Sequence, residues 1–341
     1  MLEKTLALLT GIKPGTHLPD DAECYDPAEI DELGRVLRRL VYAPSSIRKI
    51  LQDKYGVTVT RGDFYSEIPT ITEVEKSFTA PSLLKLDAIF PDNETMLAEL
   101  ARLTEVSVEF DPPVTSDRKG EYSWRGGQFS YSDAMSYYAM IRTRKPRTIV
   151  EIGCGWSTLV AQIACARNGM GRIICIEPYP NEFLREMTGI ELVQKRAQDM
   201  ETGFFNDALS DGDLLFIDST HTVKHDSDCL HIYLRILPAI AADITVHVHD
   251  INFPETLSLK QMRETQIFWN EQYLLYAYMC ENPRVRTLYG SRYHAKRNPR
   301  ALERFMHGRF PSGGASFWFE QKKEAVKQFE ITYLRIAEVG R

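Results

Sequence analysis

Thr148-Ile-Val-Glu-Ile-Gly-Cys-Gly-Trp-Ser-Thr158 joins a short apolar run, ending in an acid, to a glycine-rich turn. An apolar run rich in β-branched residues predicts a buried parallel strand. Gly153 and Gly155 can adopt the backbone angles of a tight strand-to-helix turn, and they let a ligand approach the backbone where a side chain would block it. From Ser157 the pattern is helical, so the free N–H groups of the first helical turn point into the glycine turn. The stretch therefore predicts a cradle for a polar ligand.

Glu151, near the end of the predicted strand, distinguishes between two kinds of ligand. A dinucleotide site places a pyrophosphate at the start of the helix, and a carboxylate at the strand end would repel it. The acid therefore opposes a nicotinamide-dependent oxidoreductase. It favours a ligand with a cationic amino-acid head and no phosphate, and S-adenosylmethionine is such a ligand. The motif alone also fits ordinary strand–turn–helix packing, so the elements that follow have to decide.

Four more strand patterns follow along the chain, at residues 171–178, 190–194, 213–218 and 244–250. Strand patterns that alternate with helical patterns predict βαβ units and a parallel sheet. Counting the strand that ends near Glu151 as the first, acids end the first, second, fourth and fifth strands. The carboxyl ends of parallel strands meet at one edge of a sheet, where ligands bind. Each acid alone is better explained as a solvated loop residue or a helix cap. The ordered series reverses that preference and predicts a site.

The loops after two of these strands carry groups suited to a nucleoside. Glu177 ends the second strand, and its carboxylate can accept hydrogen bonds from both hydroxyls of a ribose. Gln198 and Asp199 follow the third strand in a polar loop that is able to hydrogen-bond the edge of an adenine. Together with the glycine turn, these groups predict an adenosine-containing ligand.

These motifs resemble those of class I S-adenosylmethionine-dependent methyltransferases, whose first motif is acid-x-Gly-x-Gly-x-Gly, here with Ser157 in place of the third glycine. Three further segments resemble the branch known as methyltransferase family 24: Phe268–Tyr273, Glu177–Pro180 and Val248–Ile251. The resemblance covers residues 124 to about 319. It is specific to fold and cofactor but not to substrate.

The resemblance implies an α/β, Rossmann-like class I methyltransferase fold with a seven-stranded, mostly parallel sheet. Segments 284–289 and 315–319 would form an antiparallel pair at the sheet edge, and a helix ending at Arg144 would cover the methionine end of the cofactor. The implied contacts with S-adenosylmethionine are Glu151, Gly153, Gly155, Ser157, Glu177, Pro178, Gln198, Asp199 and Asp218.

Methyl transfer from a sulfonium is an in-line displacement, so the protein has to align the reactants and remove a proton from the acceptor. His221 lies three residues past Asp218, in a loop expected to face the acceptor, and is the predicted base. Asp218 or Asp250 would orient it, and His249 is the second candidate. The alternative is that His221 caps a helix beginning near residue 224. His225 is expected at the surface and His247 as a satisfied buried histidine.

A divalent ion such as Mg²⁺ is a further possibility that the resemblance leaves open. Some catechol and sugar methyltransferases hold one with carboxylates at these strand ends, where it lowers the pKa of the acceptor hydroxyl. Asp218 and Asp250 match two of the positions. The third is in doubt, because those enzymes have an acid or amide directly after the aspartate, whereas here Ile251 precedes Asn252.

The composition narrows the partners. The 341 residues carry a net charge of -6, which gives no broad attraction for nucleic acid or an anionic membrane. A small-molecule or peptide acceptor fits better. The six cysteines include no C-x-x-C pair and are interpreted as small core residues. No stretch reaches the roughly 18 apolar residues that span a bilayer, and no signal peptide is evident, so the expected location is cytoplasmic.

We expect three regions: a helical extension at 1–120, acting as a lid or in homo-oligomer formation; the methyltransferase domain at 121–320; and a charged tail at 321–341 that docks as a helix on a partner subunit. Within the domain, the pattern predicts one long helix over Leu259–Cys280 and a basic loop at 291–300, either solvated or a substrate flap.

The sequence thus predicts an S-adenosylmethionine-dependent methyltransferase that acts on an oxygen of a small-molecule acceptor. Two alternatives remain at this point. One is an N-methyltransferase acting on a peptide or small molecule. The other is a non-catalytic partner subunit with the methyltransferase fold.

Overall fold

The computed structural model describes residues 26–78 and 84–323. The chain forms two compact units, residues 1–80 and 81–341. The expected boundary at residue 120 does not coincide with this division. The helix α5 (Asn93–Ser107) belongs to the second unit, because Met96, Leu100 and Leu103 are buried in its core.

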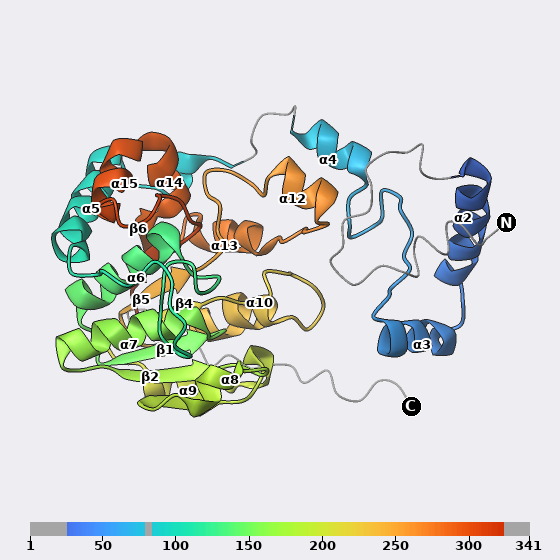
Figure 1. Ribbon diagram of the computed structural model, residues 1–341. Helices are drawn as coiled ribbons and strands as arrows, with labels where there is room; N and C mark the ends of the chain where they lie inside the picture. The colour runs from blue at the N-terminus through green and yellow to red at the C-terminus, as the bar shows by residue number, and fades with distance from the viewer. Residues whose placement is uncertain (1–25, 79–83, 324–341) are drawn as a thin grey trace. The chain divides into compact units, whose positions relative to one another are not determined.

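Within residues 26–78, the described part of the first unit, the helices are α2 (Pro27–Val41), α3 (Ser45–Tyr55) and α4 (Ile71–Ser77), drawn in blue in Figure 1. Asp26 caps α2, since its Oδ1 accepts a hydrogen bond from Ala28 N at 2.8 Å. Across residues 26–78, the one large apolar side chain that is buried is Val74. The neighbouring rings of Phe64 and Tyr65 contact each other and are 79% and 72% exposed.

The second unit is built on a seven-stranded sheet in the order β3-β2-β1-β4-β5-β7-β6. Its strands are β1 (Thr148–Ile152), β2 (Arg172–Ile176), β3 (Ile190–Val193), β4 (Leu214–Ile217), β5 (Ile244–Val248), β6 (Val285–Gly290) and β7 (Phe317–Gln321). The first five are parallel, and β7 runs antiparallel to both of its neighbours. The predicted fold class, including the antiparallel pair at the edge, is confirmed.

Helices cover both faces of the sheet, so successive strand residues are buried on opposite sides. Ile149 of β1 lies in a core cluster with residues of α6 and α7, whereas Val150 and Ile152 lie in a second cluster with Phe205 and Ile232. The helical segments, some labelled in Figure 1, are η2 (Leu86–Ala88), α6 (Tyr131–Arg144), α7 (Trp156–Asn168), α8 (Glu182–Glu186), η3 (Ala197–Asp199), α9 (Thr202–Ala208), α10 (Asp228–His231), η4 (Ile232–Ile236), α11 (Leu237–Ala239), α12 (Leu259–Glu264), α13 (Glu271–Met279), α14 (Ser291–Arg297) and α15 (Pro299–Met306).

The prediction of one long helix over Leu259–Cys280 is wrong. The segment forms two helices, α12 and α13, with an irregular stretch over residues 265–270 between them. Gln266 has a φ of +52°, a value that interrupts a right-handed helix. In the irregular stretch, the ring of Trp269 contacts the ring of His221 in the loop after β4.

The predicted basic loop at 291–300 is also wrong. The segment forms α14 and the start of α15, which begins with Pro299 in its first turn. Ser291, Tyr293 and His294 are buried, so one face of α14 contributes to the core and the basic residues occupy the other face.

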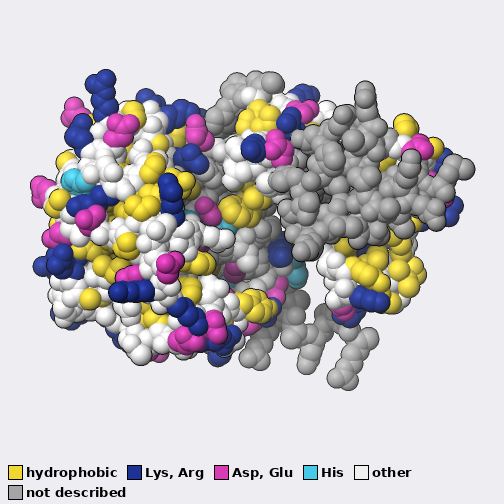
Figure 2. Space-filling view, viewed as in Figure 1, with side chains coloured by type: hydrophobic (Ala, Val, Ile, Leu, Met, Phe, Trp, Pro, Cys, Tyr) yellow, Lys and Arg dark blue, Asp and Glu magenta, His cyan; other side chains and the backbone are white. Residues whose placement is uncertain are grey.

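The described cysteines are unpaired thiols, three of them buried, as their assignment to the core predicted. Lys/Arg and Asp/Glu side chains are interspersed on the described surface seen in Figure 2. Within the described residues, no helix is long and apolar enough to cross a membrane. The expected C-terminal helix lies almost wholly outside the described residues, which end at 323.

Candidate functional site

The glycine turn between β1 and α7 contains two glycines with different surroundings. Gly153 has a φ of +80°, and a Cβ atom there would clash with the backbone oxygen of Asp218. Its lack of a side chain is therefore required by the fold. At Gly155 the atom nearest to an added Cβ would be Asn181 Nδ2 at 4.0 Å, so the free chain leaves room for a side chain. The turn also lies directly against the end of β4.

Glu151 lies beneath this turn and does not line its opening. Its side chain is fully buried and accepts hydrogen bonds from Tyr137 Oη at 2.7 Å and from Thr158 Oγ1. Burial raises the pKa of Glu151 to about 7, although these donors oppose the shift. Ser157, in the first turn of α7, is buried as well. Glu151 and Ser157 can therefore influence a ligand in the turn only indirectly, through the groups that lie between them and the ligand.

Glu177 lies beside the turn at the end of β2. Its Oε1 accepts a hydrogen bond from Tyr179 N at 2.8 Å, and its Oε2 lies 3.4 Å from Cys154 N in the turn. Pro178 follows it and is half-buried. The loop after β3 reaches this group, since Gln194 Nε2 donates to Pro178 O at 3.3 Å.

Gln198 and Asp199 lie in η3, after β3. Arg196 donates to both oxygens of Asp199 at 2.7 Å, and these hydrogen bonds lower the pKa of the exposed Asp199 carboxyl. Gln198 is half-buried, with its Nε2 3.4 Å from Asp226 O. A ligand using Asp199 would thus share it with Arg196.

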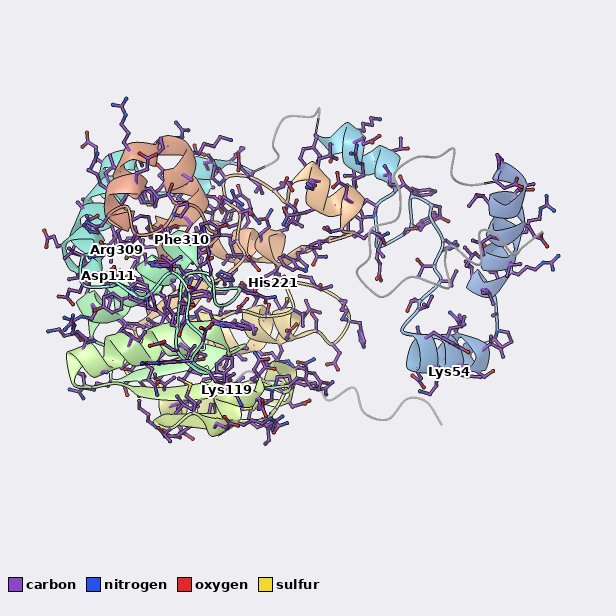
Figure 3. The ribbon with its side chains drawn as sticks, viewed as in Figure 1. Lys54, Asp111, Lys119, His221, Arg309 and Phe310 are labelled. Carbon is purple, nitrogen blue, oxygen red and sulfur yellow. The ribbon has the colours of Figure 1, made fainter. Side chains whose placement is uncertain are left out.

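His221, labelled in Figure 3, lies just beyond β4. Three carboxylates contact its ring. Its Nε2 is 3.2 Å from Asp218 Oδ1 and 3.5 Å from Asp250 Oδ2, while its Nδ1 is 2.8 Å from Glu271 Oε2. The imidazole is 6% exposed. The structure therefore brings together His221, Asp218 and Asp250, as the sequence predicted, and adds Glu271.

His249 lies on the other side of Asp218. Its Nδ1 is 3.4 Å from Asp218 Oδ1, and its Nε2 is 3.3 Å from Asp133 Oδ2. Asp133 is buried in the first turn of α6, where it also accepts hydrogen bonds from the backbone of Ala315. Asp218 thus lies between two imidazole rings.

The charges in this cluster shift one another's pKa values. Burial opposes ionisation of Asp218, but His249 and His221 hold its pKa well below the usual range. Burial also works against protonation of both histidines. Hydrogen bonds to Asp218 and Glu271 nevertheless raise the pKa of His221 to about 10, and the charge of Asp218 raises that of His249. Burial raises the pKa of Asp250. These carboxylates therefore favour the protonated form of both imidazoles in the free protein.

Two residues of the cluster have left-handed backbone conformations, His221 with a φ of +57° and Asp250 with a φ of +56°. Asp and His enter this region more readily than most residues, but the conformation still has to be held by its surroundings. His221 is held by α13, since its carbonyl accepts hydrogen bonds from Asn270 N at 2.9 Å and Glu271 N at 3.1 Å.

The structure rules out the capping role considered for His221 and bears out the expected exposure of His225 and burial of His247. The helix after β4 begins at Asp228 and is capped by Ser227, so His221 is not its cap. His225 is exposed, as expected. His247 is fully buried, bonded to Ser316 Oγ at 2.7 Å and stacked on Trp318, and burial lowers its pKa.

Sequence reasoning missed Asp133 and Glu271. The sequence places Asp133 within a covering helix, and Glu271 at an interior position of the long helix that proved to be broken. One signal was available for Glu271: it follows Asn270, a residue type that commonly begins helices. No comparable local signal identified Asp133.

A divalent cation fits the chemistry of one group in the cluster. Asp218, His221 and Asp250 each offer a ligand atom, and these atoms lie within 4.8 Å of one another. The Asn252 side chain has a contact of its own, since its Nδ2 lies 3.5 Å from Asp250 O. Among the His, Cys, Asp and Glu side chains of the described residues, His221 is the third member of this group.

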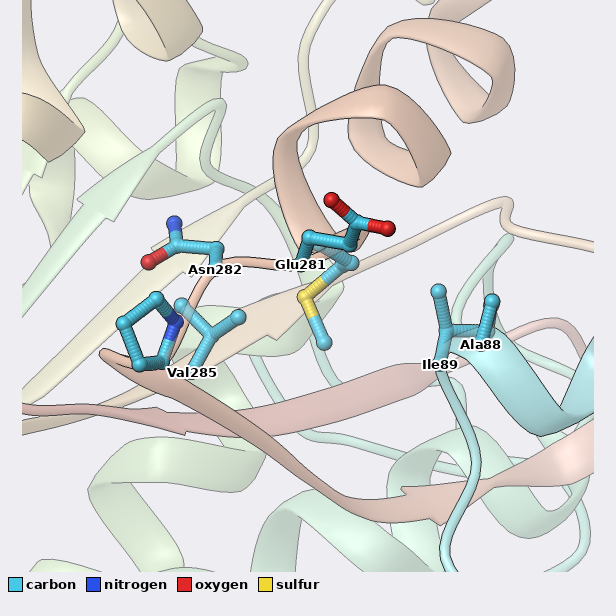
Figure 4. A pocket seen from close by; sticks show the side chains of 7 residues that line it. Ala88, Ile89, Glu281, Asn282 and Val285 are labelled. Carbon is cyan, nitrogen blue, oxygen red and sulfur yellow. The ribbon is translucent and has the colours of Figure 1, made fainter.

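A surface pocket of about 300 Å³ lies elsewhere, between η2 and the start of β6 (Figure 4). Val285, which lines the pocket, pairs with Gln321 of β7, and Gln321 pairs with Ile244 at the start of β5. The pocket is therefore at the opposite edge of the sheet from the cluster and is not part of it.

Comparisons with known sequences bear on the family of the chain. Residues 150–251, from β1 to just beyond β5, match the model of methyltransferase family 24, described as a methyltransferase domain. An uncharacterized protein of Archaeoglobus fulgidus (strain ATCC 49558) is 35% identical over an alignment of 156 residues, and the alignment covers 42% of this chain and 71% of the relative.

Among solved structures, the plantazolicin methyltransferase BpumL in complex with SAH aligns with 84% of this chain and 100% of its own, at 10% identity and a TM-score of 0.35. The O-methyltransferase TomG from Streptomyces achromogenes in complex with SAM aligns with 70% of this chain and 94% of its own, at 13% identity and a TM-score of 0.35.

Proposed function

Since the chain belongs to the class I S-adenosylmethionine-dependent methyltransferases, in the family 24 branch, we propose that it methylates a hydroxyl oxygen of a small-molecule acceptor. The observation that supports this best is the position of His221. Its Nε2 lies 3.2 Å from Asp218, and the backbone of Asp218 lies directly against Gly153 of the glycine turn. The imidazole proposed as the base therefore lies close to the turn that would hold the methyl donor.

The proposed cofactor site runs along the ends of β1, β2 and β3. The turn at Gly153 and Gly155 would receive the methionine part, and Glu177 the ribose. Gln198 and Asp199 would meet the adenine, with Pro178 between the two subsites. This assignment is supported by contacts that join the three strand ends: Cys154 N lies near the Glu177 carboxylate, and the loop after β3 donates a hydrogen bond to Pro178 O. Glu151 and Ser157 would act from below the turn, and Asp218 at its far side.

We assign His221 as the base that takes the acceptor proton, with His249 as the next candidate. When the ring is neutral, its Nδ1–H remains bonded to the Glu271 carboxylate, so Nε2 carries the free lone pair. Because the pKa of His221 is about 10 in the free protein, this form is scarce at neutrality. Groups that occupy Asp218 and Asp250 during the reaction would lower that pKa by engaging the carboxylates that stabilise the proton.

A divalent cation held by the carboxylates of Asp218 and Asp250 is one such group. His221 would stay outside its ligand set in this reaction, because a cation on Nε2 would occupy the lone pair that takes the acceptor proton. Bound to the two carboxylates, the cation would supply charge that lowers the pKa of an acceptor hydroxyl. The protein's own residues would align the acceptor and exclude water. Asp218 would align the acceptor beside the turn, and the buried surroundings of His249 would exclude water.

One observation favours a second candidate, N-methylation of an amine. Four carboxylates, Asp133, Asp218, Asp250 and Glu271, surround only two imidazoles. This excess of negative charge stabilises a cationic amine in the site. It would also require the base to remove an ammonium proton before transfer.

The test is a screen of hydroxyl- and amine-bearing metabolites and peptides with S-adenosylmethionine labelled at the methyl group. Label recovered on oxygen supports the proposal, and label on nitrogen supports the second candidate. Purified protein that binds S-adenosylmethionine, yet transfers label to neither class with Mg²⁺ present, would contradict both.

A further inference from the structure

Glu271 is the buried acid at the start of α13. It is 1% exposed, and its N–H donates to the His221 carbonyl at 3.1 Å while its carboxylate meets the ring of the same histidine. His221 is therefore attached to α13 at both its backbone and its side chain. The break in the predicted long helix is what brings the acid to this position.

The carboxylate is fully engaged. Oε2 accepts from Ser219 Oγ at 2.9 Å and lies 2.8 Å from His221 Nδ1, while Oε1 accepts from Tyr233 Oη at 2.9 Å. Ser219 and Tyr233 hold the carboxylate from two directions, so its orientation toward the imidazole is fixed. The ring of Trp269 contacts the His221 ring, with their centroids 4.5 Å apart.

The adjoining residues anchor both loops of the cluster. Asn270 Oδ1 accepts from Val223 N at 2.6 Å in the loop after β4. Gln272 Oε1 accepts from Asn252 N at 3.2 Å in the loop after β5. Residues 269–272 thus tie together the two loops that carry Asp218 and Asp250, and Glu271 is the member of this segment whose carboxylate bonds to the imidazole.

We propose that Glu271 is a positioning residue for His221: it holds the proton on Nδ1 and directs Nε2 toward Asp218 and Asp250. An ionised carboxylate only accepts hydrogen bonds, so it selects the tautomer in which Nδ1 is protonated. The proposal rests on the assignment of His221 as the base. A purely structural role for Glu271 would stabilise the fold without affecting how the imidazole reacts.

The first experiment observes the ring without using activity. Proton and ¹⁵N NMR spectra of the full chain, labelled at histidine, should show a downfield, exchange-protected His221 Nδ1–H that moves upfield or disappears in Glu271→Gln. Tyr233→Phe is the matched control, because it removes a partner of Glu271 but leaves the imidazole contact; the signal should persist. An unchanged signal in Glu271→Gln would overturn the proposal whatever the protein's activity.

The second experiment is a double-mutant cycle of methyl transfer with Glu271→Gln, His221→Ala and the double variant. Glu271→Gln should lower kcat by about 10- to 100-fold with little change in KM for S-adenosylmethionine. It should cost nothing further in the His221→Ala background. Losses that multiply would show that Glu271 acts independently of His221 and would overturn the proposal. Full turnover by His221→Ala would remove the base assignment and, with it, any catalytic role for Glu271, while the NMR signal would still report the contact.

Discussion

The two halves of the strand-end edge are built differently. At the ends of β1, β2 and β3, the polar groups are mostly half-exposed or exposed, and each makes one or two local contacts, as Glu177 does with Tyr179 and Cys154. At the ends of β4 and β5, charged side chains are closely packed, and Asp218 alone lies within 3.5 Å of two imidazoles. The first half suits recognition of an incoming ligand by backbone and single side chains. The second holds its charges in one arrangement before any ligand arrives, as preorganised electrostatic catalysis requires.

The largest expected effect distinguishes the two halves by kinetics. His221→Ala should lower turnover by roughly 10²- to 10⁴-fold, because a general base contributes that much to rate, and should leave S-adenosylmethionine affinity unchanged. His225→Ala, an exposed histidine of the same loop, is the matched control. Rates and calorimetric affinities of the three proteins provide the check. Near wild-type turnover in His221→Ala would move the assignment to His249.

The next prediction separates the two glycines of the turn. Gly153→Ala should destabilise the fold by about 1–3 kcal/mol from overpacking alone, because its Cβ would meet the Asp218 carbonyl. Gly155→Ala should fold normally and bind S-adenosylmethionine more weakly, because only a ligand would occupy the space its Cβ enters. Thermal unfolding and calorimetry on both variants measure this. Equal cofactor affinity in Gly155→Ala and wild type would show that the ligand does not approach Gly155.

These glycines, and most of the polar groups at the ends of β1, β2 and β3, could be predicted from the sequence. Strand, turn and acid follow one another within a few residues there, so local pattern is enough. The arrangement at the ends of β4 and β5 depends on contacts between residues that are distant in the sequence. Glu271 is 50 positions from His221, and Asp133 is 116 positions from His249. Only the folded sheet brings them together, and the aromatic spacing of residues 259–280 concealed the helix break that places Glu271.

A smaller effect is expected at Glu177. Glu177→Ala should weaken S-adenosylmethionine binding by roughly 1.5–3 kcal/mol, about 10- to 150-fold in Kd, through loss of hydrogen bonds to a charged group. Glu191→Ala, on the exposed side of β3, should leave Kd unchanged. Isothermal titration calorimetry provides both values. Identical Kd values for Glu177→Ala and wild type would remove Glu177 from the site.

The smallest expected effect is on stability and concerns Glu151. Its pKa is raised to about 7 in the folded state, so the unfolded chain ionises first and the native state loses stability as pH rises from about 4.5 to 7. Glu151→Gln removes this loss and keeps the side-chain shape. The variant's Tm should therefore fall less than that of the wild type between pH 4.5 and 7, at about 2–4 °C per kcal/mol. If the Tm of the variant and that of the wild type changed equally between pH 4.5 and 7, the result would contradict the buried position of the Glu151 carboxyl.

Whether a histidine held among carboxylates beside the glycine turn is the base can be read from the pH dependence of kcat/KM for methyl transfer. In buffer free of divalent ions, we predict a rate that rises with pH toward an apparent pKa near 10, that of His221, with the rise absent in His221→Ala. Added Mg²⁺ should move the rise to lower pH. A profile that is flat from pH 6 to 10 in the wild type and matched by His221→Ala would contradict the assignment of His221 as the base.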